Sequence, residues 1–177
     1  MRRLLALVLS TFALAACADA DAAPETATAS GAAQTASATA PRAVGTTPQE
    51  LPTILVYKTA TCGCCKGWVE HLEAEGFTVD ARDVSGTDLM RVKMDGGIPG
   101  SMNSCHTAII DGYMVEGHVP AEQIRQLLAE RPDIAGIAAP GMPVGSPGME
   151  GPNAKPYQVM SFTHEGQTGV FADVDPR

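Results

Sequence analysis

Three cysteines lie within four residues in the stretch TILVYKTATCGCCKGW, residues 53–68 of the chain. Residues 53–57 are β-branched or aromatic in most positions and follow a proline, so they predict a β-strand. Residues 66–75 (KGWVEHLEAE) carry apolar side chains at helical spacing and are followed by a glycine, which predicts a helix that ends there. The cysteines therefore lie at the junction between a strand and a helix.

A redox pair or a structural disulfide needs only two thiols, so the third cysteine of this stretch requires another explanation. Cys62 and Cys65 have the spacing of a CxxC motif, and Cys64 lies between them. The N-terminus of a helix stabilises anions and lowers the pKa of a thiol placed there. Three thiols at such a site indicate that a soft, positively charged ion is held.

The rest of the chain alternates predicted strands and helices. Periodicity and turn signals predict strands at 77–84, 107–110 and 113–117, with Asp111-Gly112 as a hairpin turn between the last two, and helices at 88–94 and 120–130. From Ala138 the chain is rich in glycine and proline, which predicts irregular structure. Residues 157–162 and 168–174 predict a terminal hairpin.

The N-terminal residues predict export. Residues 1–16 have a basic start, a short apolar run and small residues before Cys17, which predicts a signal peptide. The sequence LAAC at 14–17 resembles the lipobox of bacterial lipoproteins, which implies lipid attachment at Cys17 and a periplasmic protein anchored to the outer membrane. Ordinary signal-peptide cleavage after Cys17 remains the alternative. Residues 17–50 lack large apolar side chains and predict a tether.

Composition limits the classes of function. The 177 residues carry a net charge of −8, which becomes −10 once the basic residues Arg2 and Arg3 leave with the signal peptide. Because a negative surface repels phosphate backbones, nucleic acid is not expected as a partner. After the tether, residues 51–135 are predicted to form one α/β domain, and residues 136–177 a methionine-containing loop and hairpin packed on it.

The order strand, CxxC, helix, strand, helix, hairpin, helix over residues 52–131 resembles the thioredoxin fold, glutaredoxins in particular. Thioredoxin-like enzymes carry a cis-proline just before the third strand, opposite the CxxC motif. Here that place is taken by Asn103-Ser104-Cys105-His106. On this resemblance Cys105 faces the other cysteines and supplies a fourth thiol, and the groove that binds substrate peptides in those enzymes is altered.

Four thiols suit Cu(I), which accepts two or three sulfur ligands and shares them between ions. Adjacent side chains diverge, so Cys64 and Cys65 favour bridging several Cu(I) ions over holding a single tetrahedral one. Two disulfides among the four cysteines are the structural alternative. The thioethers of Met142 and Met149, in the irregular loop, are candidate copper ligands or residues that fix the loop to the core.

Two histidines are further candidates. His106 follows Cys105 on a predicted strand and should therefore point to the opposite face, which weakens its claim as a ligand. His118 lies between a strand and a helix, where a metal ligand and a structural turn residue are equally compatible with the sequence.

Four blocks of sequence taken together resemble the CopG-like proteins of bacterial copper resistance: CGCCKGW at 62–68, GIPGSMNSCHT at 97–107, DGYMVEGHVPAEQI at 111–124 and GMPVGSPGME at 141–150. Those proteins are small, exported and thioredoxin-like. The resemblance implies copper binding by Cys62, Cys64, Cys65 and Cys105 and a role in copper tolerance. It implies as partners copper ions and other periplasmic copper-resistance proteins.

Two functions of different classes follow from these residues. The first is a protein that holds Cu(I), either for storage and delivery or with cycling between Cu(I) and Cu(II). The second is a thiol–disulfide oxidoreductase in which Cys62 attacks and Cys65 resolves. The extra thiol within the CxxC motif, Cys105 and the two loop methionines all favour copper.

Overall fold

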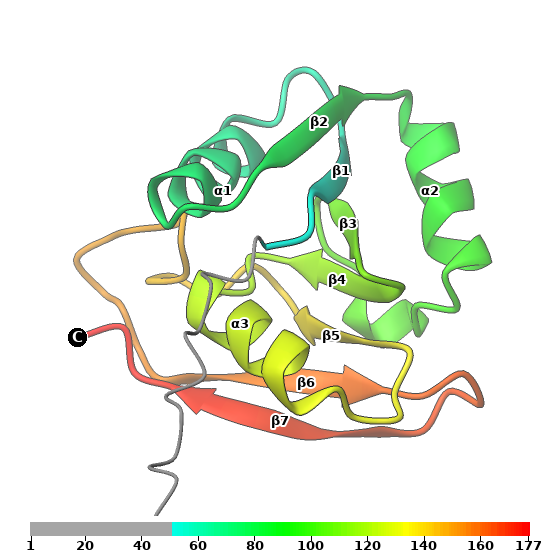
Figure 1. Cartoon of the computed structure of the whole chain (residues 1–177). Coiled ribbons are helices and arrows are strands. Elements are labelled where there is room, and N and C mark those ends of the chain that lie inside the picture. Colours follow the sequence, from blue (N-terminus) through cyan, green and yellow to red (C-terminus); the bar gives the residue numbers. More distant parts are fainter. Residues whose placement is uncertain (1–50) are drawn as a thin grey trace, which may run out of the picture. The chain divides into compact units, whose positions relative to one another are not determined.

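The computed structural model describes residues 51–177; the predicted signal peptide, Cys17 and the tether lie outside the described residues. Seven strands and three α-helices follow one another in the described part, as Figure 1 shows. The elements are β1 (Ile54–Lys58), α1 (Gly63–Ala74), β2 (Val79–Asp83), α2 (Gly86–Asp95), the 3₁₀ turn η1 (Gly100–Met102), β3 (Thr107–Ile110), β4 (Tyr113–Gly117), α3 (Ala121–Glu130), β5 (Gly136–Ala139), β6 (Tyr157–Phe162) and β7 (Thr168–Val174).

All seven strands form one mixed sheet in the order β2-β1-β3-β4-β5-β6-β7. Neighbouring strands are parallel in the pairs β1–β2 and β4–β5, and antiparallel in the other four pairs. The C-terminal hairpin therefore continues the sheet through β5. The predicted α/β class is confirmed.

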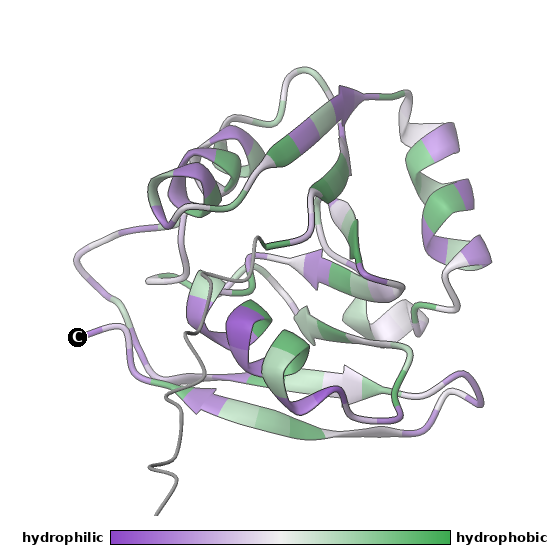
Figure 2. Cartoon of the chain, in the orientation of Figure 1, coloured by the Kyte–Doolittle hydropathy of each residue, from purple (hydrophilic) through white to green (hydrophobic). Residues whose placement is uncertain are grey.

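Alternation along the strands gives the sheet two apolar faces. One face packs against α1 and α3 and forms the larger core, whose largest members include Trp68, Leu72, Ile124, Leu127 and Ile137. The other face carries a smaller core around Met114, Ala138 and Phe162. Each fully buried large apolar side chain stabilises the fold by about 1.5–3 kcal/mol. Figure 2 shows the matching alternation of hydrophobic and hydrophilic residues around α1 and along α2.

Local signals in the sequence set several element boundaries. Asp111 and Gly112 both have positive φ, at 48° and 88°, as expected for a two-residue hairpin turn between β3 and β4. Gly76, with φ at 86°, follows α1 and allows the chain to leave the helix. Arg131 adopts a left-handed conformation directly after α3, ahead of Pro132.

The predicted strands and helices are confirmed to within a few residues, with one omission. The sequence predicted irregular structure from Ala138, but residues 136–139 form β5, which pairs parallel to β4. Gly136 is necessary for this pairing, because a Cβ there would lie 2.2 Å from the carbonyl oxygen of Met114. The glycine that helped to conceal the strand is therefore one that the close strand contact requires.

Two further features of residues 51–177 bear on the predictions. No peptide bond in this part of the chain is cis, in agreement with the absence of a proline directly before β3. No helix in it is both long enough and apolar enough to cross a bilayer.

Candidate metal centre

The first turn of α1 positions three of the four cysteine side chains. Cys62 is the N-cap of α1, and its Sγ accepts a hydrogen bond from the backbone N–H of Cys65 at 3.3 Å. Cys64 lies in the same turn, with its Sγ 3.5 Å from that of Cys62. The strand–helix junction expected from the sequence therefore gathers these thiols at a helix N-terminus, where thiolates are stabilised.

Cys105 comes from the segment before β3 and completes the group. The four Sγ atoms of Cys62, Cys64, Cys65 and Cys105 all lie within 4.8 Å of one another. In this structure Cys62 and Cys65 form a disulfide, while Cys64 and Cys105 are free thiols. The prediction that Cys105 faces the CxxC motif is confirmed.

His118 contacts the cluster with a defined ring nitrogen. Its Nε2 lies 3.0 Å from Cys105 Sγ, and its Nδ1 lies 2.7 Å from the carbonyl oxygen of Pro147. Because a carbonyl only accepts, Nδ1 carries the proton, and Nε2 presents its lone pair to the sulfur. This is the arrangement in which a histidine binds a metal while its second nitrogen is held by a backbone carbonyl.

His106 also lies beside Cys105, and the prediction that it points to the opposite face is wrong. Its Nδ1 is 3.5 Å from Cys105 Sγ. The reason is that β3 begins only at Thr107, so residues 105 and 106 do not alternate as in a regular strand. The imidazole is fully buried and packs on Trp68, with ring centroids 4.3 Å apart. Cys105, His106 and His118 form a second group of donors within 4.8 Å of one another.

The irregular loop after β5 covers the first turn of α1. A Cβ on Gly148, whose φ is 80°, would lie 2.5 Å from the carbonyl oxygen of Cys64, and one on Gly67 would lie 3.0 Å from Gly148 Cα. The backbones therefore touch where side chains are absent. Figure 1 shows this loop, in orange, running from the sheet to α1 and back.

The two candidate methionines of this loop differ in their surroundings. Met149 directly follows Gly148 and is partly buried. Met142 is 39% exposed, with a positive φ of 49°. The loop thus brings Met149 next to a residue that contacts α1, whereas Met142 stands at the surface.

Burial controls the protonation of the donors. It raises the pKa of the Cys105 thiol to about 11, with a further contribution from the nearby Cys64. Burial also lowers the pKa of His118, and it lowers that of His106 well below the ordinary range, assisted by the charge that His118 would carry. The metal-free centre therefore holds neutral imidazoles beside a protonated thiol, and a bound cation would displace the thiol proton.

Two polar contacts near the centre were not foreseen from the sequence. Lys93 and Glu116 form a buried ion pair, with Nζ 2.5 Å from Oε1. A glutamate within an otherwise apolar strand, YMVEG, was the available signal. His71 is only partly exposed, and its Nε2 accepts a hydrogen bond from the backbone N–H of Ala121 at the start of α3.

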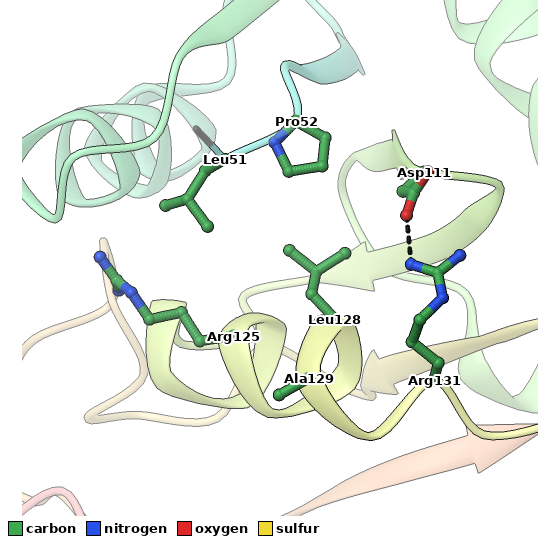
Figure 3. Close-up of a pocket in the computed structure, with 7 residues that line it drawn as sticks. All are labelled: Leu51, Pro52, Asp111, Arg125, Leu128, Ala129 and Arg131. Carbon is green, nitrogen blue, oxygen red and sulfur yellow. Dashed lines mark hydrogen bonds and ion pairs between the residues drawn. The ribbon is translucent and has the colours of Figure 1, made fainter. Parts of the chain in front are cut away.

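A separate pocket of 260 Å³ lies elsewhere, between the start of β1 and α3. Figure 3 shows Leu51 and Pro52 facing Leu128 across it, with the contact between Asp111 and Arg131 at one end. No cysteine or histidine lines this pocket, so it contributes nothing to the centre.

Comparisons with known proteins agree with this geometry. Residues 102–149 match a family described as "Protein of unknown function, DUF411". Two solved structures, described as copper resistance protein CopG in forms 1 and 2, are 51% and 52% identical to this chain. Both cover 71% of this chain, which covers 98% and 99% of theirs, at a TM-score of 0.65. The chain belongs to the CopG family of copper resistance proteins. No protein in the curated comparison matches significantly.

The matched family segment contains all the candidate donors except the cysteines of α1. It runs from Met102 to Met149 and so includes Cys105, both candidate histidines and both candidate loop methionines. The family match alone therefore does not include Cys62, Cys64 and Cys65.

The buried histidines make the stability of the metal-free chain depend on pH. In the unfolded chain a histidine has a pKa of about 6.5, whereas burial lowers the pKa of His106, His118 and His71 in the folded chain. Below about pH 6.5 the unfolded chain therefore binds more protons, and the free energy of unfolding falls as the pH drops toward the folded-state pKa values. Above that pH the contribution is fully present.

Denaturant unfolding of the metal-free chain between about pH 7.5 and pH 5 measures this dependence. The fully buried His106 adds up to about 1.4 kcal/mol per pH unit to the slope, and the partly exposed His71 adds less because solvent screens it. His106→Asn is expected to flatten the slope below pH 6.5, and His164→Asn, which replaces an exposed histidine, controls for the substitution. An unchanged slope in His106→Asn would contradict the expected contribution of His106.

Proposed function

We propose that this chain is an exported copper-resistance protein that holds Cu(I) through the thiolates of Cys62, Cys64, Cys65 and Cys105. The observation that carries the proposal is the convergence of these four Sγ atoms within 4.8 Å, from segments 40 residues apart in the sequence. Membership of the CopG family supports the copper-resistance role.

The chemistry of the donor set favours copper among biological metals. Thiolates are soft ligands that select Cu(I), Zn(II) and iron–sulfur centres over Mg²⁺ and Ca²⁺. A thiolate can bridge two Cu(I) ions, and Cys64 and Cys65 are adjacent residues whose sulfurs both belong to the cluster. We therefore assign the group to a multinuclear Cu(I) site, in which the third thiol of the CGCC motif acts as a bridge.

Neutral donors complete the proposed coordination. The Nε2 lone pair of His118 points at Cys105, and His106 Nδ1 approaches the same sulfur. Met149 and Met142, in the loop that covers α1, offer thioethers, which also bind Cu(I). The imidazole nitrogens of His106 and His118 suit Cu(II) as well as Cu(I), so the proposed site includes donors for both oxidation states.

The disulfide between Cys62 and Cys65 favours a second candidate function, thiol–disulfide exchange. Cys62 is partly exposed and Cys65 fully buried, the arrangement expected of an attacking and a resolving thiol. The element order β1-α1-β2-α2-β3-β4-α3 supports a thioredoxin-like fold. Copper binding by all four thiolates requires this disulfide to stay reduced, whereas thiol–disulfide exchange requires it to form and break in each cycle.

Export and lipid anchoring at Cys17 are part of the same proposal and rest on the sequence of residues 1–17. Mass spectrometry of the chain purified from bacterial membranes is expected to give cleavage before Cys17 and an acylated Cys17. Cys17→Ser should lose the acyl mass and leave the membrane fraction, whereas Cys64→Ser should keep both. Recovery of unmodified Cys17 at the membrane would contradict the anchor.

Removing thiols from the cluster tests the copper site. The reduced chain, titrated anaerobically with Cu(I) against a competing chelator, is expected to bind more than one Cu(I) per chain, because shared thiolates hold several ions. Cys64→Ser combined with Cys105→Ser should lower the stoichiometry and the ultraviolet absorption of the copper–thiolate bonds. Met160→Leu, which removes a sulfur atom outside the cluster, is the control.

Two results would overturn the copper site. Unchanged stoichiometry in the double variant would exclude Cys64 and Cys105 as ligands. Negligible Cu(I) binding by the reduced chain, together with rapid exchange of the Cys62–Cys65 disulfide with a model dithiol, would favour the oxidoreductase.

The loop methionines give an independent prediction. Met→Leu removes a thioether and nearly conserves volume, so folding should be preserved. If thioethers bind copper, Met149→Leu is expected to weaken Cu(I) affinity, and Met142→Leu to weaken it less, because Met142 is the more exposed. Met160→Leu, in strand β6, controls for the substitution. Equal affinities in all three variants would return both residues to a structural role.

A further inference from the structure

A single buried carboxylate binds both ends of the tetrapeptide that carries Cys105 and His106. Glu116 Oε1 accepts a hydrogen bond from the backbone N–H of Ser104 at 2.5 Å. Glu116 Oε2 accepts one from the hydroxyl of Thr107 at 2.7 Å. The carboxylate therefore spans the residues that lie immediately before Cys105 and immediately after His106.

The positive charge that balances this carboxylate comes from α2. Lys93 Nζ donates to Glu116 Oε1 at 2.5 Å and to Thr107 Oγ1 at 2.8 Å. Glu116 and Thr107 are fully buried, and Lys93 is 4% exposed. Lys93 of α2 is thus buried in order to hold the carboxylate of Glu116 in place.

The position of this network relates it to the metal centre. Thr107 and Glu116 are directly opposite each other in the β3–β4 pair, and the next contact along the two strands joins Gly117 N–H to the carbonyl of His106 at 3.1 Å. Beyond that hydrogen bond, Cys105 Sγ contacts His118 Nε2. The ion pair therefore anchors the end of the strand pair from which two proposed donors project.

Stability alone does not account for an ion pair at this position. Burying two charges is costly, and well-packed apolar residues of similar volume often serve as well or better. The neighbouring residues on this face of the sheet, Ile109 and Met114, are apolar. A carboxylate offers what an apolar side chain does not: two acceptors that fix two separate points of the Cys105 segment.

We propose that Glu116, with Lys93 as its counter-charge, is a positioning residue for the metal centre. It holds residues 104–107 so that the Cys105 sulfur stands opposite the first turn of α1. This inference rests on the proposed Cu(I) site, but it also predicts a property of the metal-free chain, namely the accessibility of the Cys105 thiol.

The test replaces the ion pair and reads out Cys105 directly. Lys93→Met combined with Glu116→Leu removes both charges and both acceptors at roughly constant volume, so the chain is expected to fold. In the full-length, metal-free chain with the Cys62–Cys65 disulfide intact, alkylation of Cys105 and Cys64 is measured by peptide mass spectrometry. The rate for Cys105 relative to Cys64 is expected to rise about tenfold, the scale of one lost hydrogen bond. Cu(I) affinity of the reduced variant should fall toward that of Cys105→Ser.

Two matched variants separate positioning from general destabilisation. Lys93→Met with Glu116→Gln is also uncharged, but its amide still accepts from Ser104 N–H and donates to Thr107, so it should restore the alkylation ratio and the affinity. Val115→Ala weakens the core at the neighbouring position of β4 without touching the network, and should leave the ratio unchanged. If Val115→Ala raises the Cys105-to-Cys64 alkylation ratio as much as Lys93→Met with Glu116→Leu does, the effect comes from general destabilisation and the inference fails.

The remaining outcomes also discriminate. Suppose that the native chain binds Cu(I) and that Cys105→Ser weakens this binding. If Lys93→Met combined with Glu116→Leu nevertheless behaves as the native chain does, this inference fails while the proposed function stands. If the native chain binds no Cu(I), the proposed function fails, and the alkylation ratio still decides whether Glu116 positions Cys105. Should Lys93→Met with Glu116→Leu not fold, Thr107→Val, which removes one end of the clamp, must raise the ratio; an unchanged ratio overturns the inference.

Discussion

The antiparallel pairing of β1 with β3 is the constraint that assembles the candidate metal centre. Its register places Tyr57, near the end of β1, opposite Thr107, the first residue of β3. The chain that leaves β1 carries the CGCC motif, and the chain that enters β3 carries Cys105. Thiols 40 residues apart in sequence therefore meet at one edge of the sheet, because antiparallel strands bring the end of one beside the beginning of the other.

The same end of the sheet carries the remaining candidate donors for the same reason. β4 is antiparallel to β3, so it ends at this edge and delivers His118; β5 is parallel to β4, so it ends there too and begins the loop that contains Met142 and Met149. Ligand sites commonly form where strand ends and their loops converge. The sheet thus carries candidate donors on four segments at one end, and burial keeps the imidazoles neutral, the state in which they bind metal.

The sequence predicted the elements well where periodicity or turn chemistry is local, as in the Asp111-Gly112 turn and the terminal hairpin. It did not reveal β5, because the residues GIAA resemble a loop until β4 and β6 lie on either side. It placed His106 wrongly, because alternation was applied to residues that precede the regular strand. It missed the Lys93–Glu116 pair, since α2 and β4 are distant in sequence and nothing local joins a lysine to a glutamate across 23 residues. The errors on β5 and on the ion pair concern tertiary contacts, whereas the error on His106 concerns the local start of β3.

Two segments of the sequence form the candidate metal centre. The CGCC turn of α1 is one; the segment from Met102 to Met149, which matches the DUF411 family, is the other. They touch through the cysteine sulfurs and through the backbones of Gly67 and Gly148, where a side chain would separate them. Glu116 fixes Cys105 within the second segment, and the Pro147 carbonyl fixes His118. Two candidate donors of the second segment, Cys105 and His118, therefore have hydrogen-bonded supports within that segment that do not involve the cysteines of the CGCC turn.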